Sequence, residues 1–172
     1  MIEARPEIRW WLWGLLAFAV VIAMSLAITA PEAVTWGIGE HQAAGTAWRV
    51  DEIQTQWREG GVRGVAIAAM LGDLVFIGIY GWGSWLAGRS FLAMTGLVRV
   101  LGLIVAIAAI VFVLCDYTET VLQLIQLVRD RGSDAMAGIA ATVRPLKVMA
   151  WLATFFGIIA ALLIRTFAGR PT

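Results

Sequence analysis

Three carboxylates interrupt otherwise apolar stretches of this sequence. Asp73 lies within the apolar run 64–88, and Asp116 and Glu119 lie one helical turn apart in the run 97–125. An ionised Asp near the centre of a membrane helix costs about 2.5–3.5 kcal/mol or more. Carboxylates that converge there must take up protons, pair with bases or hold a cation. These three are therefore candidate residues for binding a proton, a cation or a polar headgroup.

Other side chains complete this candidate site. Tyr80 falls two helical turns after Asp73 on the same helix face. The basic side chains expected within reach of the carboxylates are His41, Arg63, Arg129, Arg144 and Lys147. A structural interpretation is the alternative: Asp73 and Asp116 would hold helices together through hydrogen bonds or through pairing with one of these bases. The sequence leaves both interpretations open.

The elements that must position these residues follow from composition. Of the 172 residues, 60% are apolar and 15% are charged, against about 45–50% and about 25% in globular proteins. Each long apolar run can cross a hydrocarbon layer of about 30 Å. We predict an all-α integral membrane protein, an antiparallel bundle of four transmembrane helices that forms a single membrane domain over residues 1–172. The predicted spans are 10–30, 64–88, 97–125 and 145–167.

Antiparallel order would bring the carboxylates to one level. Asp73 stands nine residues after Gly64, and Asp116 stands nine residues before Ile125, where the third span would leave the membrane. Because consecutive helices run in opposite directions, both carboxylates fall about 13 Å from the same surface by helical rise. We therefore expect one shared site between the second and third spans.

The polar segment 31–63 separates the first two spans. Gly37–Gly39 are expected to break the backbone, Thr46 to cap a helix and Gly60 to end it. That helix would be amphipathic, with a narrow apolar stripe made of Val50, Ile53 and Trp57. Two interpretations stay open: an interfacial helix that caps the bundle, and a lid over a site within it.

The ends of the last two spans and the orientation come from local signals. The helical pattern of the third span continues past Asp116, which predicts a helix of about 30 residues that projects beyond the membrane. Pro145 is expected at the start of the last helix, which makes 129–144 a link. The 89–99 link and the C-terminal tail contain Arg and no acids, which favours cytoplasmic termini.

Residue counts exclude several functions. The 13 basic and 12 acidic residues form no block of like charge, so nucleic acid is not an expected partner. Cys115 is the only cysteine and provides neither a disulfide nor a cysteine metal site. His41 is the only histidine and is expected in a loop, which excludes haem held by two histidines. We expect no cofactor and rank a membrane enzyme last among the function classes.

Two function classes remain. Short links, small residues repeated along helix faces and the lack of catalytic groups favour an accessory or structural subunit of a membrane assembly. Its partners would be the lipid bilayer and either other membrane subunits or a second copy of the chain. The alternative is a small transporter, channel or ligand-binding protein that uses Asp73, Asp116 and Glu119 for a proton, a cation or a polar headgroup.

Five short motifs lie within residues 44–120. They are Ala44-Gly45-Thr46, Trp57, Gly60-Gly61, Asp73-x-x-Phe76-x-x-x-Tyr80 and Asp116-x-x-Glu119. Together they resemble a group of small bacterial four-helix membrane proteins that are generally described as uncharacterised. The resemblance implies the same bundle, the same acidic residues and a place in the bacterial inner (cell) membrane. It implies no known activity.

Overall fold

Residues 6–168, the part of the chain that this computed structural model describes, contain six helices. Their bounds are α1 Arg9–Ile28, α2 Ile38–Gln42, α3 Ala47–Glu59, α4 Arg63–Leu92, α5 Gly96–Arg129 and α6 Asp134–Ala168. The helices α1, α4, α5 and α6 are each long and apolar enough to cross a membrane. The protein is therefore a small four-span helical membrane protein. Arg5 and Arg170, which contribute to the predicted orientation, lie outside the described residues.

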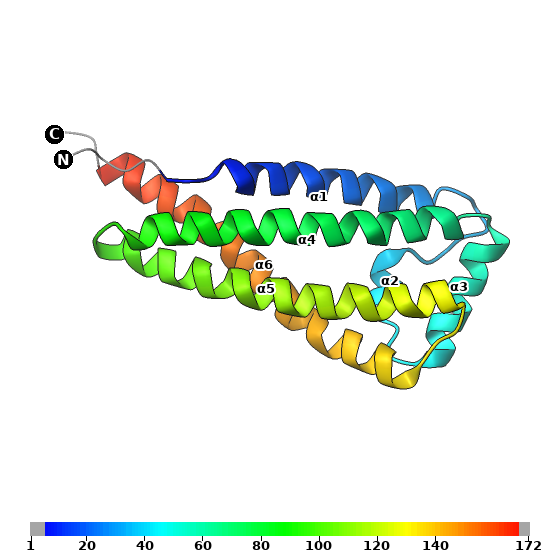
Figure 1. Cartoon of the computed structure of the whole chain (residues 1–172). Coiled ribbons are helices and arrows are strands. Elements are labelled where there is room, and N and C mark those ends of the chain that lie inside the picture. The colour runs from blue at the N-terminus through cyan, green and yellow to red at the C-terminus, as the bar shows by residue number, and fades with distance from the viewer. Residues whose placement is uncertain (1–5, 169–172) are drawn as a thin grey trace.

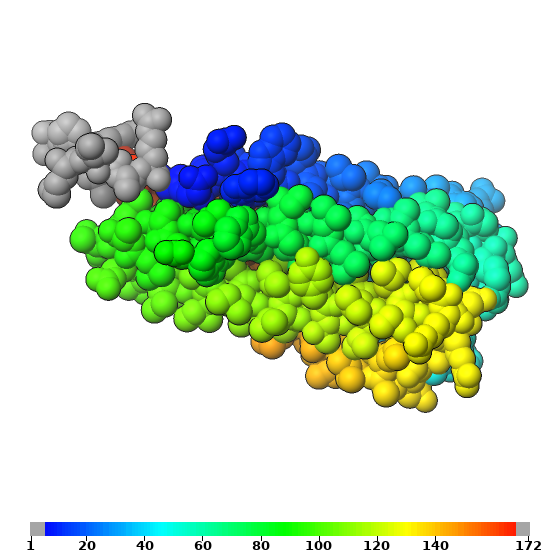
Figure 2. All heavy atoms as spheres, viewed as in Figure 1, coloured from blue at the N-terminus to red at the C-terminus, as the bar shows by residue number. Residues whose placement is uncertain are grey.

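The four long helices form an antiparallel bundle, as predicted. The helices α1, α4 and α5 lie side by side, and α6 crosses behind them at an angle (Figure 1). Figure 2 shows α1, α4 and α5 making one continuous face, with the N-terminal half of α6 emerging below α5. Towards its other end α6 meets α1 through two ring pairs, Trp11–Phe155 and Phe18–Trp151, whose centroids are 6.0 and 5.4 Å apart.

Small residues allow these helices to approach closely. A Cβ at Gly83 of α4 would lie 2.2 Å from the backbone N of Trp11 in α1. A Cβ at Gly102 of α5 would lie 2.6 Å from the backbone N of Leu92, at the end of α4. These small residues therefore pack helices of the same chain against one another.

The last helix begins earlier than the sequence predicts. It starts at Asp134, so Pro145 lies inside it and most of the predicted 129–144 link is helical. Proline removes one backbone hydrogen bond from a helix. However, Ala137 and Ala140 before it are buried, and alanine favours the helix more than any other residue. An Asp in the first turn also suits the positive end of the helix dipole.

The segment between α1 and α4 folds against one end of the bundle (Figure 1). Its longer helix, α3, is the predicted amphipathic helix. At its start Thr46 Oγ1 accepts a hydrogen bond from the backbone N of Arg49 at 3.3 Å. Its predicted apolar stripe is buried and consists of Val50, Ile53 and Trp57. The cap, the end at Glu59 and the stripe are all confirmed.

A second short helix, α2, forms where the sequence predicts a break. The backbone N of Gly37 donates a hydrogen bond to Glu40 Oε2 at 2.9 Å, which caps the first turn of α2. A carboxylate three residues into a helix is a common partner for such an N-terminal N–H. The glycines at 37 and 39 therefore begin a helix, and the prediction of a simple break is wrong.

Candidate functional site

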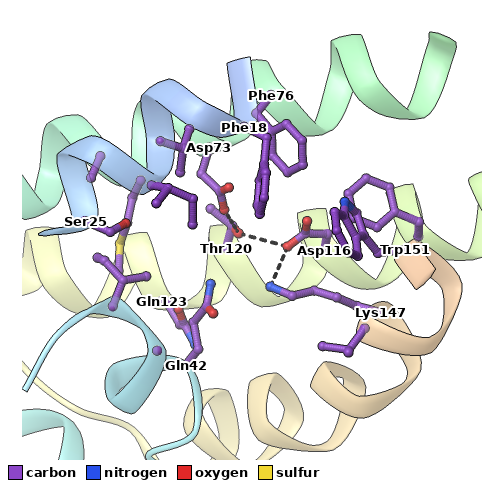
Figure 3. A pocket seen from close by; sticks show the side chains of 18 residues that line it. Phe18, Ser25, Gln42, Asp73, Phe76, Asp116, Thr120, Gln123, Lys147 and Trp151 are labelled. Carbon is purple, nitrogen blue, oxygen red and sulfur yellow. Dashed lines mark hydrogen bonds and ion pairs between the residues drawn. The ribbon is translucent and has the colours of Figure 1, made fainter. Parts of the chain in front are cut away.

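The three carboxylates expected to converge do lie together, and we call Asp73, Asp116 and Glu119 the acidic cluster. Thr120 Oγ1 donates a hydrogen bond to Asp73 Oδ2 at 2.9 Å and lies 3.5 Å from Asp116 Oδ1 (Figure 3). The Nζ of Lys147 lies 2.8 Å from Asp116 Oδ1 and 2.6 Å from Glu119 Oε2. One threonine and one lysine thus link α4, α5 and α6 at this level of the bundle.

Asp116 and Glu119 are buried and Asp73 is half-buried, and the acidic cluster contains more negative charge than Lys147 offsets. The side chains of Asp116 and Glu119 are 3% and 0% exposed, and that of Lys147 is 13% exposed. Among residues 6–168, Asp73 makes no ion pair and Glu119 Oε1 has no hydrogen-bond partner. Three ionised carboxylates beside one ammonium group would leave two uncompensated charges, which a membrane interior disfavours strongly. Protons or a bound cation must therefore complete the balance.

A cavity of about 320 Å³ lies directly beside the acidic cluster. Asp73, Asp116 and Lys147 line it on one side, and Figure 3 shows all three side chains directed towards a common space. Four aromatic rings also line it, and they are Phe18, Phe76, Phe112 and Trp151. Its volume is at the small end of the range for ligand sites, about 300–1,000 Å³.

The short helix α2 covers the cavity at the end of the bundle. Ile38, Gly39 and Gln42 of α2 all line the cavity. Next to α2, Gln123 of α5 lines the same cavity (Figure 3), and its Nε2 lies 3.5 Å from the carbonyl O of His41. The segment 31–63 therefore covers this space with α2, while its predicted amphipathic helix α3 packs across the end of the bundle.

Tyr80 lies apart from the acidic cluster. Its hydroxyl is 2.8 Å from Thr154 Oγ1 of α6, and its ring packs edge-on against Phe112 with centroids 5.3 Å apart. The side chain is completely buried in the apolar core. Tyr80 therefore contacts α6 through its hydroxyl and does not reach the carboxylates.

Of the predicted charge partners, Lys147 contacts the acidic cluster directly, Arg144 attracts Glu119 over a longer range, and Arg63 and Arg129 lie elsewhere. Arg63 Nη2 donates a hydrogen bond to the carbonyl O of Leu127 at 2.8 Å, near the end of α5. Arg129 is exposed at that same end. Arg144 extends towards α2, where its Nη2 lies 3.9 Å from the position of a Cβ on Gly39. Lys147 succeeds because its long flexible stem lets the ammonium group reach inward.

His41 is buried in the cap, and the prediction of a loop residue is wrong. It lies within α2 with 1% of its surface exposed, and its ring packs against Trp57 with centroids 4.9 Å apart. Its Nε2 lies 3.1 Å from Gln54 Nε2. Burial lowers the pKa of His41 from 6.5 to about 4. The ring is therefore neutral near pH 7 and supplies no positive charge to the carboxylates.

Several cavity residues are missing from the sequence-based site. Gln123 lies seven residues after Asp116, two helical turns along the same face of α5. The polar spacing from Asp116 through Thr120 to Gln123 is the signal that could have identified it. Phe18 and Trp151 carry no such signal, because their sequence neighbourhoods resemble any other apolar membrane segment.

Comparison of the chain with protein-family models, curated proteins and solved structures finds no match. The chemistry of the site therefore has to be argued from its geometry. Asp73, which makes no ion pair with any described residue, presents its carboxylate to a cavity that aromatic rings also line. Such a wall suits a positively charged group, because the carboxylate attracts the charge and ring faces add cation–π attraction.

Proposed function

We propose that this protein binds a small ligand with a positively charged group in the cavity between α1, α4, α5 and α6. It would act as a ligand-binding protein, a transporter or a channel for that ligand. The observation that supports this function is the position of Asp73, which lines a cavity of about 320 Å³ and has no ion pair within the described chain. A bound cation would supply the charge that Lys147 leaves uncompensated.

The hydrogen bonding of the acidic cluster favours Asp73 as the binding group. Asp116 and Glu119 are both engaged by Lys147, at 2.8 and 2.6 Å. Within residues 6–168, Asp73 accepts a hydrogen bond from Thr120 and makes no ion pair. A cation that enters the cavity would therefore gain most beside Asp73, while Lys147 would keep it from the other two carboxylates.

An accessory or structural role in a membrane assembly stays a prediction. The repeat of small residues favours this role in the sequence. However, Gly83 and Gly102 pack helices within the chain. Native mass spectrometry of protein purified in mild detergent tests this role. A second membrane subunit at fixed stoichiometry would support it, whereas a lone chain would argue against it.

Binding of an ammonium compound tests the proposed function. Tetramethylammonium and dodecyltrimethylammonium are suitable probes, and radiolabelled forms can be measured on the protein in nanodiscs. We expect at least one of them to bind, and D73N to weaken that binding about tenfold or more, as expected for losing a charge-assisted interaction. Glu59→Gln is the matched control, because Glu59 is an exposed acid on α3. If neither probe binds in a way that depends on Asp73, the proposed function is wrong.

The membrane and the orientation are further parts of the proposal. We propose the bacterial inner membrane, with both termini in the cytoplasm, as the resemblance and the Arg-containing links favour. Four spans place the two ends of the chain on one side of the membrane, and α1 begins at the end of the bundle where α6 finishes (Figure 1). A reporter enzyme that is active only in the cytoplasm, fused to each terminus in turn, tests this orientation, and both fusions should be active.

A further inference from the structure

We propose that the ligand of this cavity is an amphipathic organic cation that arrives from the bilayer. Its ammonium group would lie beside Asp73, and its hydrocarbon chain would extend to lipid between α1 and α6. The inference rests on the proposed function and names the class of ligand and its route. The opening of the cavity, its cover and the composition of its walls carry the argument.

The cavity opens sideways, between α1 and α6. Ile22 of α1 and Val148 of α6 both line it, and each is 43% exposed at the surface of the bundle. The two helices meet through Phe18 and Trp151 and diverge from there towards α2 (Figure 1). The rim residues are apolar and belong to membrane spans, so the opening faces the region that lipid chains occupy.

The end of the cavity nearest the polar segment is covered. The cover is α2, which is anchored by the buried His41. Gln54 of α3 and Gln123 of α5 lie within 3.1 and 3.5 Å of His41 through their side-chain nitrogens, so α2 is tied to two other helices. A solute arriving from water would have to displace this cover, whereas a molecule already in the bilayer would not.

The interior of the cavity is divided between charge and aromatic surface. Asp73 and Asp116 provide negative charge, and Phe18, Phe76 and Trp151 provide ring surface close by. Ammonium groups are attracted to both kinds of surface. A carboxylate or phosphate headgroup would instead meet two acids, with Lys147 already engaged by Asp116 and Glu119. The walls therefore select a cationic headgroup.

The size of the cavity requires the rest of the ligand to lie outside it. A volume of about 320 Å³ is enough for a small headgroup and its first carbons. A long alkyl chain does not fit inside, and the apolar rim at Ile22 and Val148 offers it a way out. The chain partitions from water into the bilayer and concentrates the ligand beside the opening, so the affinity measured against the aqueous concentration should rise with chain length.

The test compares three probes on the full chain in lipid nanodiscs. Dodecyltrimethylammonium has the headgroup and the chain, tetramethylammonium has the headgroup alone, and laurate has a chain with an anionic headgroup. Radiolabelled dodecyltrimethylammonium is the tracer. We expect the unlabelled compound to displace it at concentrations about tenfold or more below those that tetramethylammonium needs, and we expect laurate not to compete. D73N should weaken binding about tenfold or more, and Asp73→Glu, which keeps the charge, should retain it.

Two variants at the opening test the route. Ile22→Trp and Val148→Trp place a large ring at the rim and should slow or weaken binding of the long-chain probe. Ile107→Trp is the control, since Ile107 is a similarly exposed residue on α5 that does not line the cavity. Each variant is used only if its melting temperature and elution volume match those of the unchanged protein.

The outcomes separate the two proposals. If tetramethylammonium binds as tightly as the long-chain probe, in an Asp73-dependent way and without effect of the rim variants, the ligand class and route are wrong while the proposed function stands. If laurate competes as well as the cation, the selection of a cationic headgroup is wrong. If no ammonium probe shows Asp73-dependent binding, both proposals fail.

Discussion

Replacing Lys147 by methionine should destabilise the protein strongly. Methionine keeps much of the length and apolar surface of the side chain and removes the charge. Lys147 Nζ contacts Asp116 at 2.8 Å and Glu119 at 2.6 Å, so the substitution leaves two carboxylates on one helix turn without their base. Their side chains are 3% and 0% exposed, so water cannot take the place of the ammonium group.

The expected loss follows from the energetics of buried ion pairs. Removing one partner of a buried pair typically costs about 3–5 kcal/mol, because the remaining charge is stranded in a medium of low dielectric constant. Proton uptake by the carboxylates limits this loss, and we therefore expect about 3 kcal/mol for Lys147→Met. Neutralising the stranded partners as well, with Asp116→Asn and Glu119→Gln, should recover much of it.

The free energy of unfolding is measured by titrating the protein from mild detergent into a denaturing anionic detergent. Arg131→Met is the control for losing a basic side chain, because Arg131 is exposed, and it should change the free energy of unfolding by less than about 0.5 kcal/mol. The reasoning is refuted if Lys147→Met matches this control. It is also refuted if the triple variant is no more stable than Lys147→Met alone.

Two further predictions concern the cap and the helix packing. The pKa of His41 falls from 6.5 to about 4 on folding, so the stability that its neutral ring contributes is fully present above pH 6.5 and is lost as the pH drops towards 4. At about 1.36 kcal/mol per pKa unit, the loss is about 3 kcal/mol. The free energy of unfolding measured at both pH values should show this loss, and His41→Gln should abolish the part that comes from His41. Gly83→Ala should cost about 1–3 kcal/mol, because its Cβ would lie 2.2 Å from the backbone N of Trp11, whereas Gly64→Ala, with no atom within 4 Å, should cost nothing in the same titration. Equal melting temperatures for the two alanine variants would contradict the close packing of α1 on α4.

Much of the fold could be predicted because membrane spans are a local property of sequence. Each residue adds its own transfer free energy, so an apolar run identifies a span whatever its neighbours in space. The helix α3 could also be predicted, since the Thr46 cap and the stripe ending at Trp57 are short-range patterns. The start of α6 could not, because burial of Ala137 and Ala140 outweighs the local signal of Pro145.

The convergence of the carboxylates lies between these two cases. The spacing of Asp73 and Asp116 within antiparallel spans places them at one level, and the structure joins both to Thr120. The sequence did not identify Lys147 as the base that Asp116 and Glu119 share, because several basic residues lie at comparable distances along the chain. Helix α6 crosses behind α5 (Figure 1), and its Lys147 reaches Asp116 there (Figure 3).

The sequence by itself determined that lipid surrounds the helices, how many spans there are and the level in the bundle at which the carboxylates are buried. Tertiary structure decided that His41 is buried and neutral, that Tyr80 bonds to Thr154 and that a cavity lies beside Asp73. The physical reason is the range of the interactions. Hydropathy and helical rise act along the chain, whereas ion pairs, ring contacts and cavities depend on how each helix is rotated and inclined against the others.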